Sequence, residues 1–188
     1  MFKKLLVFWI LVVGCFSCQN SPQGPVENPT QIQKYFSIAD FIQDQIERLE
    51  GLAIEKDLYV NGDHEQVIQR LSSEEWRNEL DWFIQADINK ASLATAYDIQ
   101  ENNGKTLYKL KDGEKSEIQE MTVFYNGERV DEVWIKSHDR NTFYQSETLA
   151  KLSTDALTGK LSTYELETTQ KVVVLSPRTL KVKSKVVD

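Results

Sequence analysis

The 188-residue sequence predicts an α+β domain: two N-terminal amphipathic helices with a hairpin between them, packed on a long antiparallel β-meander. Two stretches before residue 90 repeat apolar residues at three- and four-residue spacing, as the buried side of a helix does. After Leu93 this period is lost. Asn-Gly and Asp-Gly pairs then separate short runs rich in aromatic and β-branched residues, which is typical of strands joined by tight turns.

The chain begins with a predicted lipoprotein signal peptide, residues 1–14. A basic leader is followed by a run of apolar residues, Leu5–Val13, and then by Gly14 and Cys15. The apolar run is shorter than the roughly 20 residues of a membrane-spanning helix, and its flanks follow the secretory pattern. Val12-Val13-Gly14-Cys15 resembles the lipobox of bacterial lipoproteins, in which the cysteine thiol receives diacylglycerol.

Lipidation is predicted at Cys15, with Cys18 as the alternative. Gly14 leaves room for the peptidase beside Cys15, whereas Phe16 fits poorly next to a cut before Cys18. Residues 19–188 contain no cysteine, so no disulfide and no thiolate metal site is expected in the folded part. A signal peptide without lipidation, followed by two incidental cysteines, is the other interpretation.

Residues 15–28 are predicted to be the lipidated cysteine and a flexible tether, and residues 29–188 a single α+β domain. The tether is polar and rich in Pro and Gly. Removal of Lys3 and Lys4 with the signal leaves 20 basic against 29 acidic residues, a net charge of −9. This charge disfavours nucleic acid as a partner and leaves the covalent lipid anchor to hold the protein at a membrane.

The first helix is expected to start at Asn28-Pro29, because Asn can cap a helix and Pro fits its first position. Its apolar side runs through Leu49, and Gly51 can end it. A hairpin is expected over 52–71, since Asn61-Gly62 suits a type I′ turn between two strand-like runs.

The second helix is expected to open with a capping box formed by Ser72 and Glu75. Its inner side comprises Trp76, Leu80, Phe83, Ile84 and Ile88. Asn89 or the next residues should end it. The polar groups of Asp87-Ile88-Asn89-Lys90 are expected to cap the helix end and to hydrogen-bond the sheet.

The remaining strands are predicted at 94–101, 105–111, 117–125, 129–137, 142–148, 161–168, 171–175 and 179–187. In the last one Leu180, Val182 and Val186 alternate with Lys181, Lys183 and Lys185, so one face is expected to be buried and the other wet. The lysines are interpreted as a guard against edge-to-edge pairing, with a binding stripe for an acidic partner as the alternative. Several strands are apolar at both parities, which indicates either closure into a curved half-barrel or cover by a ligand or partner.

No pattern for catalysis stands out. His64 and His138, each beside an aspartate, are expected on hairpin ends in solvent. The sequence has no HExxH, GxSxG or SxxK motif and no phosphate-binding glycine loop. No catalytic residue, no metal ligand and no cofactor is therefore assigned, and the binding residues stay open.

The lipobox around Cys15, Asp87-Ile88-Asn89-Lys90 after a Trp-containing helix, Ser162-Thr163-Tyr164 and Gln170-Lys171 together form a loose pattern over most of the mature chain. In this order they resemble uncharacterised Bacteroidota-type envelope lipoproteins. The resemblance implies an address in the cell envelope and supplies no catalytic residue.

These observations favour a non-enzymatic envelope lipoprotein with a binding or structural role. We expect an envelope protein as its partner and a location at the outer membrane, facing the periplasm. The alternative is a carrier of lipid or another hydrophobic ligand, similar in layout to the half-barrel lipoprotein-localisation factors. An envelope hydrolase is the third hypothesis. An apolar cavity between sheet and helices would favour the carrier, and a filled interior the interaction module.

Overall fold

The structure is a computed structural model that describes residues 30–187. The predicted signal peptide, the lipidation sites Cys15 and Cys18, and the tether lie outside the described residues, as does Asp188.

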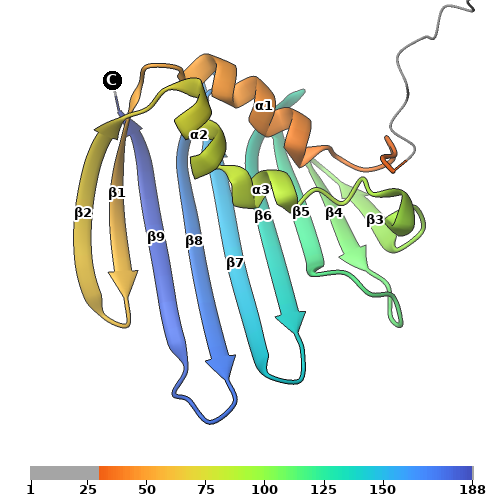
Figure 1. Cartoon of the computed structure of the whole chain (residues 1–188). Coiled ribbons are helices and arrows are strands. Elements are labelled where there is room, and N and C mark those ends of the chain that lie inside the picture. The colour runs from red at the N-terminus through yellow and green to blue at the C-terminus, as the bar shows by residue number, and fades with distance from the viewer. Residues whose placement is uncertain (1–29, 188) are drawn as a thin grey trace, which may run out of the picture.

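Nine antiparallel strands form one sheet in the order β2-β1-β9-β8-β7-β6-β5-β4-β3 (Figure 1). The strands are β1 (Ala53–Val60), β2 (Asp63–Arg70), β3 (Tyr97–Asn102), β4 (Lys105–Leu110), β5 (Ile118–Asn126), β6 (Arg129–Arg140), β7 (Tyr144–Thr154), β8 (Leu161–Val172) and β9 (Arg178–Val187). From β3 to β9 each strand pairs with the next one along the chain, and β9 then pairs with β1. The predicted antiparallel meander is confirmed, and it stays open, with β2 and β3 at its edges.

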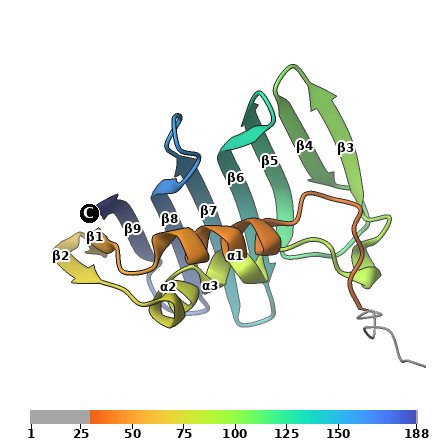
Figure 2. The ribbon, with the colours of Figure 1, turned by 90° about the horizontal axis from the view of Figure 1, so that it is seen from above.

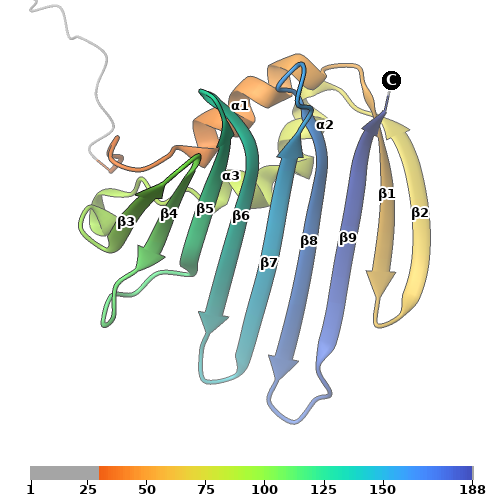
Figure 3. The same ribbon diagram turned by 180° about the vertical axis from the view of Figure 1, so that it is seen from behind.

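Short helices cover one end of one sheet face (Figures 1 and 3). They are α1 (Ile38–Leu49), α2 (Ser73–Glu79), α3 (Asp81–Gln85) and the single 3-10 turn η1 (Ala91–Leu93). Seen from above, all of them lie on the same side of the sheet (Figure 2). Their apolar side chains meet those of the strands in one core, whose largest fully buried members are Trp76, Tyr164, Phe83, Ile38, Ile42, Ile46 and Leu49. We call the side of the sheet that carries the helices the helix face.

The first helix starts later than predicted, at Ile38 instead of Pro29. Residues 30–37 form no helix and bend at 33–35, because Gln31 forms a β-bridge with Lys90 and the Ile32 amide donates to the Asn89 carbonyl. Ser37 is the N-cap, and its hydroxyl accepts from the Asp40 amide. Gly51, at φ +76°, follows the helix end as expected.

The second helix is shorter than predicted and broken. The capping box is confirmed: the Ser72 hydroxyl accepts from the Glu75 amide, and the Glu75 carboxylate accepts from the Ser72 amide. At Leu80 the backbone leaves helical geometry, and α3 ends at Gln85 instead of near Asn89. Trp76, Leu80 and Phe83 are still fully buried, as predicted for the inner side of this helix.

The hairpin is confirmed, because Asn61 and Gly62 both take positive φ, at 51° and 100°, between β1 and β2. The predicted strand at 171–175 is wrong. Strand β8 continues to Val172, and the following residues form the turn to β9, in which Val174 leaves strand geometry at φ +66°.

The last strand is not an edge, so the interpretation of its lysines as an edge guard is wrong. Strand β9 lies between β1 and β8, and its lysines face carboxylates on both neighbours. Lys183 lies opposite Asp57 on one side and Glu165 on the other, and the Lys181 Nζ is 2.7 Å from the Glu167 carboxylate. Opposite charges paired across strands explain the row within the sheet.

Candidate functional site

The segment Asp87–Lys90 fastens the start of the described chain to the domain. The Asp87 carboxylate accepts from the Ser37 hydroxyl at 3.1 Å and from the Ala39 amide at 3.0 Å, so it caps α1. The buried Asn89 amide oxygen accepts from the Tyr35 backbone N–H at 2.9 Å, and its NH₂ donates to the Tyr35 carbonyl. The predicted cap on the second helix is confirmed only for Lys90, whose Nζ donates to the carbonyl of Gln85, the last residue of α3. The predicted hydrogen bonds to the sheet are wrong, because Asp87 and Asn89 bond α1 and the segment before it.

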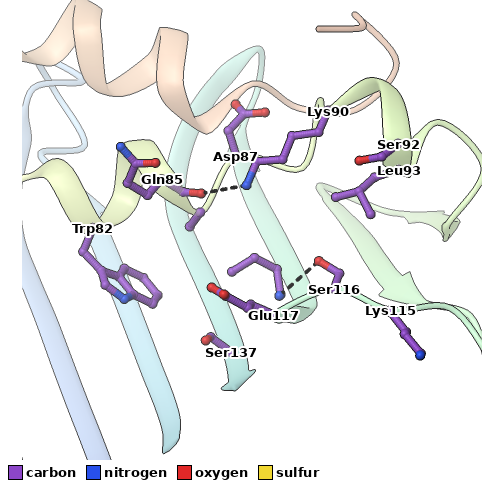
Figure 4. A pocket seen from close by; sticks show the side chains of 12 residues that line it. Trp82, Gln85, Asp87, Lys90, Ser92, Leu93, Lys115, Ser116, Glu117 and Ser137 are labelled. Carbon is purple, nitrogen blue, oxygen red and sulfur yellow. Dashed lines mark hydrogen bonds between the residues drawn. The ribbon is translucent and has the colours of Figure 1, made fainter. Parts of the chain in front are cut away.

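Immediately beside the segment Asp87–Lys90 lies an open pocket of about 340 Å³ (Figure 4). We call it the α3 pocket. Its lining residues come from α3, the segment after α3, the β4–β5 connection and β6: Trp82, Gln85, Ala86, Asp87, Lys90, Ser92, Leu93, Lys115, Ser116, Glu117, Ile118 and Ser137. Its volume lies within the range of small-ligand sites.

The α3 pocket combines fixed and free polar groups. The Ser116 hydroxyl accepts from the Tyr97 hydroxyl at 2.8 Å. It also accepts from the Ile118 amide at 3.3 Å, and Lys90 Nζ donates to the Gln85 carbonyl at 3.4 Å (Figure 4). Within residues 30–187 the side chains of Lys115 and Glu117 make no hydrogen bond or ion pair and are exposed. The α3 pocket is thus lined by one free cation, Lys115, by one free carboxylate, Glu117, and by the half-buried Trp82 ring on the side opposite Lys115 (Figure 4).

A second polar cluster lies on the helix face beneath α2. Lys56 Nζ is 2.8 Å from the Glu79 carboxylate, and both side chains are only about one-sixth exposed. The Tyr164 hydroxyl donates to the other Glu79 oxygen. Burial of the Tyr164 ring, together with the Glu79 charge, raises the pKa of this phenol above its ordinary value of 10.0. Every charged group here has a partner, so the cluster ties α2 to β1 and β8.

His64 lies at a hairpin end and is exposed, as expected, whereas His138 is half-buried, so its expected place in solvent is wrong. His64, in β2, is 2.7 Å from the Asp57 carboxylate and stacks on the Tyr59 ring on the face away from the helices. His138, in β6, has a buried Nε2 without a hydrogen-bond partner in the part of the chain that the structure describes. None of the pocket-lining residues named above is a histidine. Among residues 30–187 no group of His, Cys, Asp and Glu is arranged to hold a metal ion.

The chain matches no known family model, no curated protein and no solved structure. No helix within residues 30–187 is long and apolar enough to cross a bilayer.

Sequence reasoning did not find the α3 pocket. Its walls come from segments up to 55 positions apart, between Trp82 and Ser137, and no spacing rule joins them. One signal was available: Lys115-Ser116-Glu117 is a polar run inside a connection longer than a tight turn, and longer connections carry function more often than tight turns.

Proposed function

We propose that this chain is a membrane-anchored, non-enzymatic binding protein of the bacterial cell envelope. In this proposal the α3 pocket receives a charged, polar group of an envelope protein, and the acylated Cys15, or Cys18, holds the domain at the outer membrane on the periplasmic side. The free side chains of Lys115 and Glu117, which line the same pocket as the Trp82 ring, are the observation that carries it. Aromatic rings are enriched at the centres of interfaces. Charged groups around such a centre steer association and give specificity.

The composition of the α3 pocket supports binding over hydrolysis. Acyl transfer needs a nucleophile hydrogen-bonded to a base. The pocket serines are Ser92, Ser116 and Ser137, and within residues 30–187 their only side-chain partner is the Tyr97 hydroxyl on Ser116. A site with opposite charges and no such pair is suited to recognition.

Photo-crosslinking in the native envelope tests the binding role. A photoreactive residue at Ser92, which lines the α3 pocket and is exposed, should give one discrete protein adduct. The same residue at Gln66, exposed on β2 and away from the pocket, should not. Adducts of equal yield and pattern at both positions, or none at Ser92, would contradict the proposal.

A charge exchange makes the test specific. Lys115→Glu combined with Glu117→Lys reverses the two free charges without changing the net charge, and we expect the Ser92 adduct to be lost. The matched control exchanges Lys136 and Glu147, an exposed pair 3.2 Å apart on the other face of the sheet. This control should keep the adduct.

Intact mass and membrane fractionation test the anchor. Cys15→Ala should abolish acylation and membrane retention, whereas Cys18→Ala should not. The reverse result would assign the anchor to Cys18. Retention of the double variant in the membrane fraction would refute the lipoprotein assignment.

A hydrophobic-ligand carrier is the second candidate, with the sheet as a curved half-barrel lidded by the helices. It is favoured by half-buried apolar residues on the helix face beyond the helices, namely Leu58, Leu166 and Val182. Against it stand the filled core beneath the helices and the charged walls of the α3 pocket. A carrier should copurify with lipid, and Val182→Asp should remove that lipid; a lipid-free native protein would exclude this candidate.

A further inference from the structure

Four large apolar side chains lie in water at the end of the sheet opposite the helices. Phe143, in the β6–β7 turn, is 73% exposed, and Val173, Val174 and Leu175, in the β8–β9 turn, are 57%, 96% and 56% exposed. The Val173 amide donates to the Phe143 carbonyl at 2.9 Å, so the two turns lie side by side. Both project from the lower end of the sheet in Figures 1 and 3. We call these four residues the apolar tip.

The apolar tip carries a basic collar, although the whole chain is acidic. Arg140 precedes the first turn, and Lys171 and Arg178 flank the second; all three are exposed and form no ion pair within residues 30–187. Neither 140–146 nor 168–180 contains Asp or Glu. The nearest acid in β6, Asp139, accepts a hydrogen bond from the Tyr144 hydroxyl. The two turns and their flanks therefore carry positive charge, whereas the whole chain has a net charge of −7.

The backbone holds the tip in an unfavourable conformation. Val174 has φ +66°, in the left-handed region that a β-branched side chain rarely adopts. Its conformation and its exposure both oppose folding, so neither core packing nor local propensity explains a valine there. Glycine would meet the same φ without this strain.

We propose that the apolar tip inserts into the headgroup region of an anionic lipid bilayer, with Arg140, Lys171 and Arg178 bound to lipid phosphates. Apolar side chains at projecting turns, ringed by cations, match the boundary between acyl chains and anionic headgroups. Both turns project from the sheet (Figures 1 and 3), and a fluid bilayer accepts such a projection without a shaped partner surface. This inference does not depend on the α3 pocket.

Lipid photo-crosslinking tests this contact in the full acylated chain. A photoreactive residue replaces Phe143 in the tip or, as control, Leu157, which is 87% exposed in the β7–β8 turn at the other end of the sheet. The chain is reconstituted in vesicles of phosphatidylcholine with phosphatidylglycerol. We expect lipid adducts at position 143 and few at 157. Equal lipid yields at the two positions, or none at 143, would overturn the proposal.

Charge variants separate insertion from mere proximity to the anchor. Lys171→Ala and Arg178→Ala should each lower the lipid adduct yield at position 143 about fivefold in anionic vesicles. In phosphatidylcholine alone they should have little effect. In the native envelope a protein adduct at position 143 in place of lipid would assign the tip to a protein partner and overturn the bilayer contact. Unchanged circular dichroism would show that the variants fold.

Discussion

The two ends of the sheet treat apolar side chains in opposite ways. At the helix-covered end, α1, α2 and α3 bring Ile42, Trp76 and Phe83 to zero exposure against the strands. At the other end, Phe143 and Val174 extend into water on turns that no helix reaches (Figure 1). The same residue types thus stabilise the fold at one end and contribute nothing to it at the other.

This difference indicates which apolar residues call for an explanation other than folding. A buried aromatic residue is explained by the core it fills, whereas a cluster of exposed apolar residues has no such explanation. The helix-covered end therefore accounts for folding, and the apolar tip and the α3 pocket are where interaction has to be sought.

The largest effect is expected from a matched pair of phenylalanines. Phe83→Ala should lower the free energy of unfolding by about 3–5 kcal/mol, because it leaves a cavity beside the Tyr164 ring. Phe143→Ala, at 73% exposure, should change it by less than about 0.5 kcal/mol. Urea denaturation measures both. Similar losses in the two variants would mean that the tip is packed in solution and would break the comparison.

A smaller effect is expected at Asn89, in the segment Asp87–Lys90 beside the α3 pocket. Asn89→Ala should cost about 2–3 kcal/mol, because it leaves the buried Tyr35 N–H and C=O without partners. Asn103→Ala, in the exposed β3–β4 turn, is the control and should be near neutral. Hydrogen exchange of the amides of residues 32–36 would show whether the loss is local. Protection as in the parent chain would contradict the role of Asn89.

The Tyr164 cluster predicts a pH dependence. A phenol whose pKa is raised by folding stabilises the domain fully below pH 10, its ordinary pKa, and loses that contribution as the pH rises further. Tyr164→Phe should cost about 1.5–3 kcal/mol at neutral pH, since it removes a hydrogen bond to a carboxylate. Denaturation midpoints measured up to about pH 11 should fall more steeply for the parent than for Tyr164→Phe. Tyr59→Phe, on the opposite face, should keep the parent's slope.

The parts of the fold that depend on local pattern were predictable. The capping box at Ser72 needs only two side chains three residues apart, and the Asn61-Gly62 turn needs only two adjacent residues that tolerate positive φ. The meander follows from turn spacing for the same reason.

The parts that depend on distant partners were not predictable. The start of α1 is set by Asp87, 50 positions after Ser37, and the place of β9 inside the sheet is set by its pairing with β1. The helical spacing of Ile32 and Tyr35 suggested a longer helix, but hydrogen bonds to Asn89 hold that segment in a non-helical conformation. The α3 pocket was not predicted for the same reason, because segments far apart in the sequence form it.

The smallest expected effect is a gain in stability, whereas the other substitutions are expected to lower it or leave it unchanged. Val174→Gly should raise the free energy of unfolding by about 0.5–1 kcal/mol, since glycine removes the strain of φ +66° and loses only part of that gain to chain entropy. Urea denaturation of the parent and the variant measures this. In the same variant, lipid adducts at position 143 should fall, because the most exposed apolar side chain of the tip is gone. Lower stability in Val174→Gly would mean that the valine contributes to the fold, and the tip would then need no function to explain it.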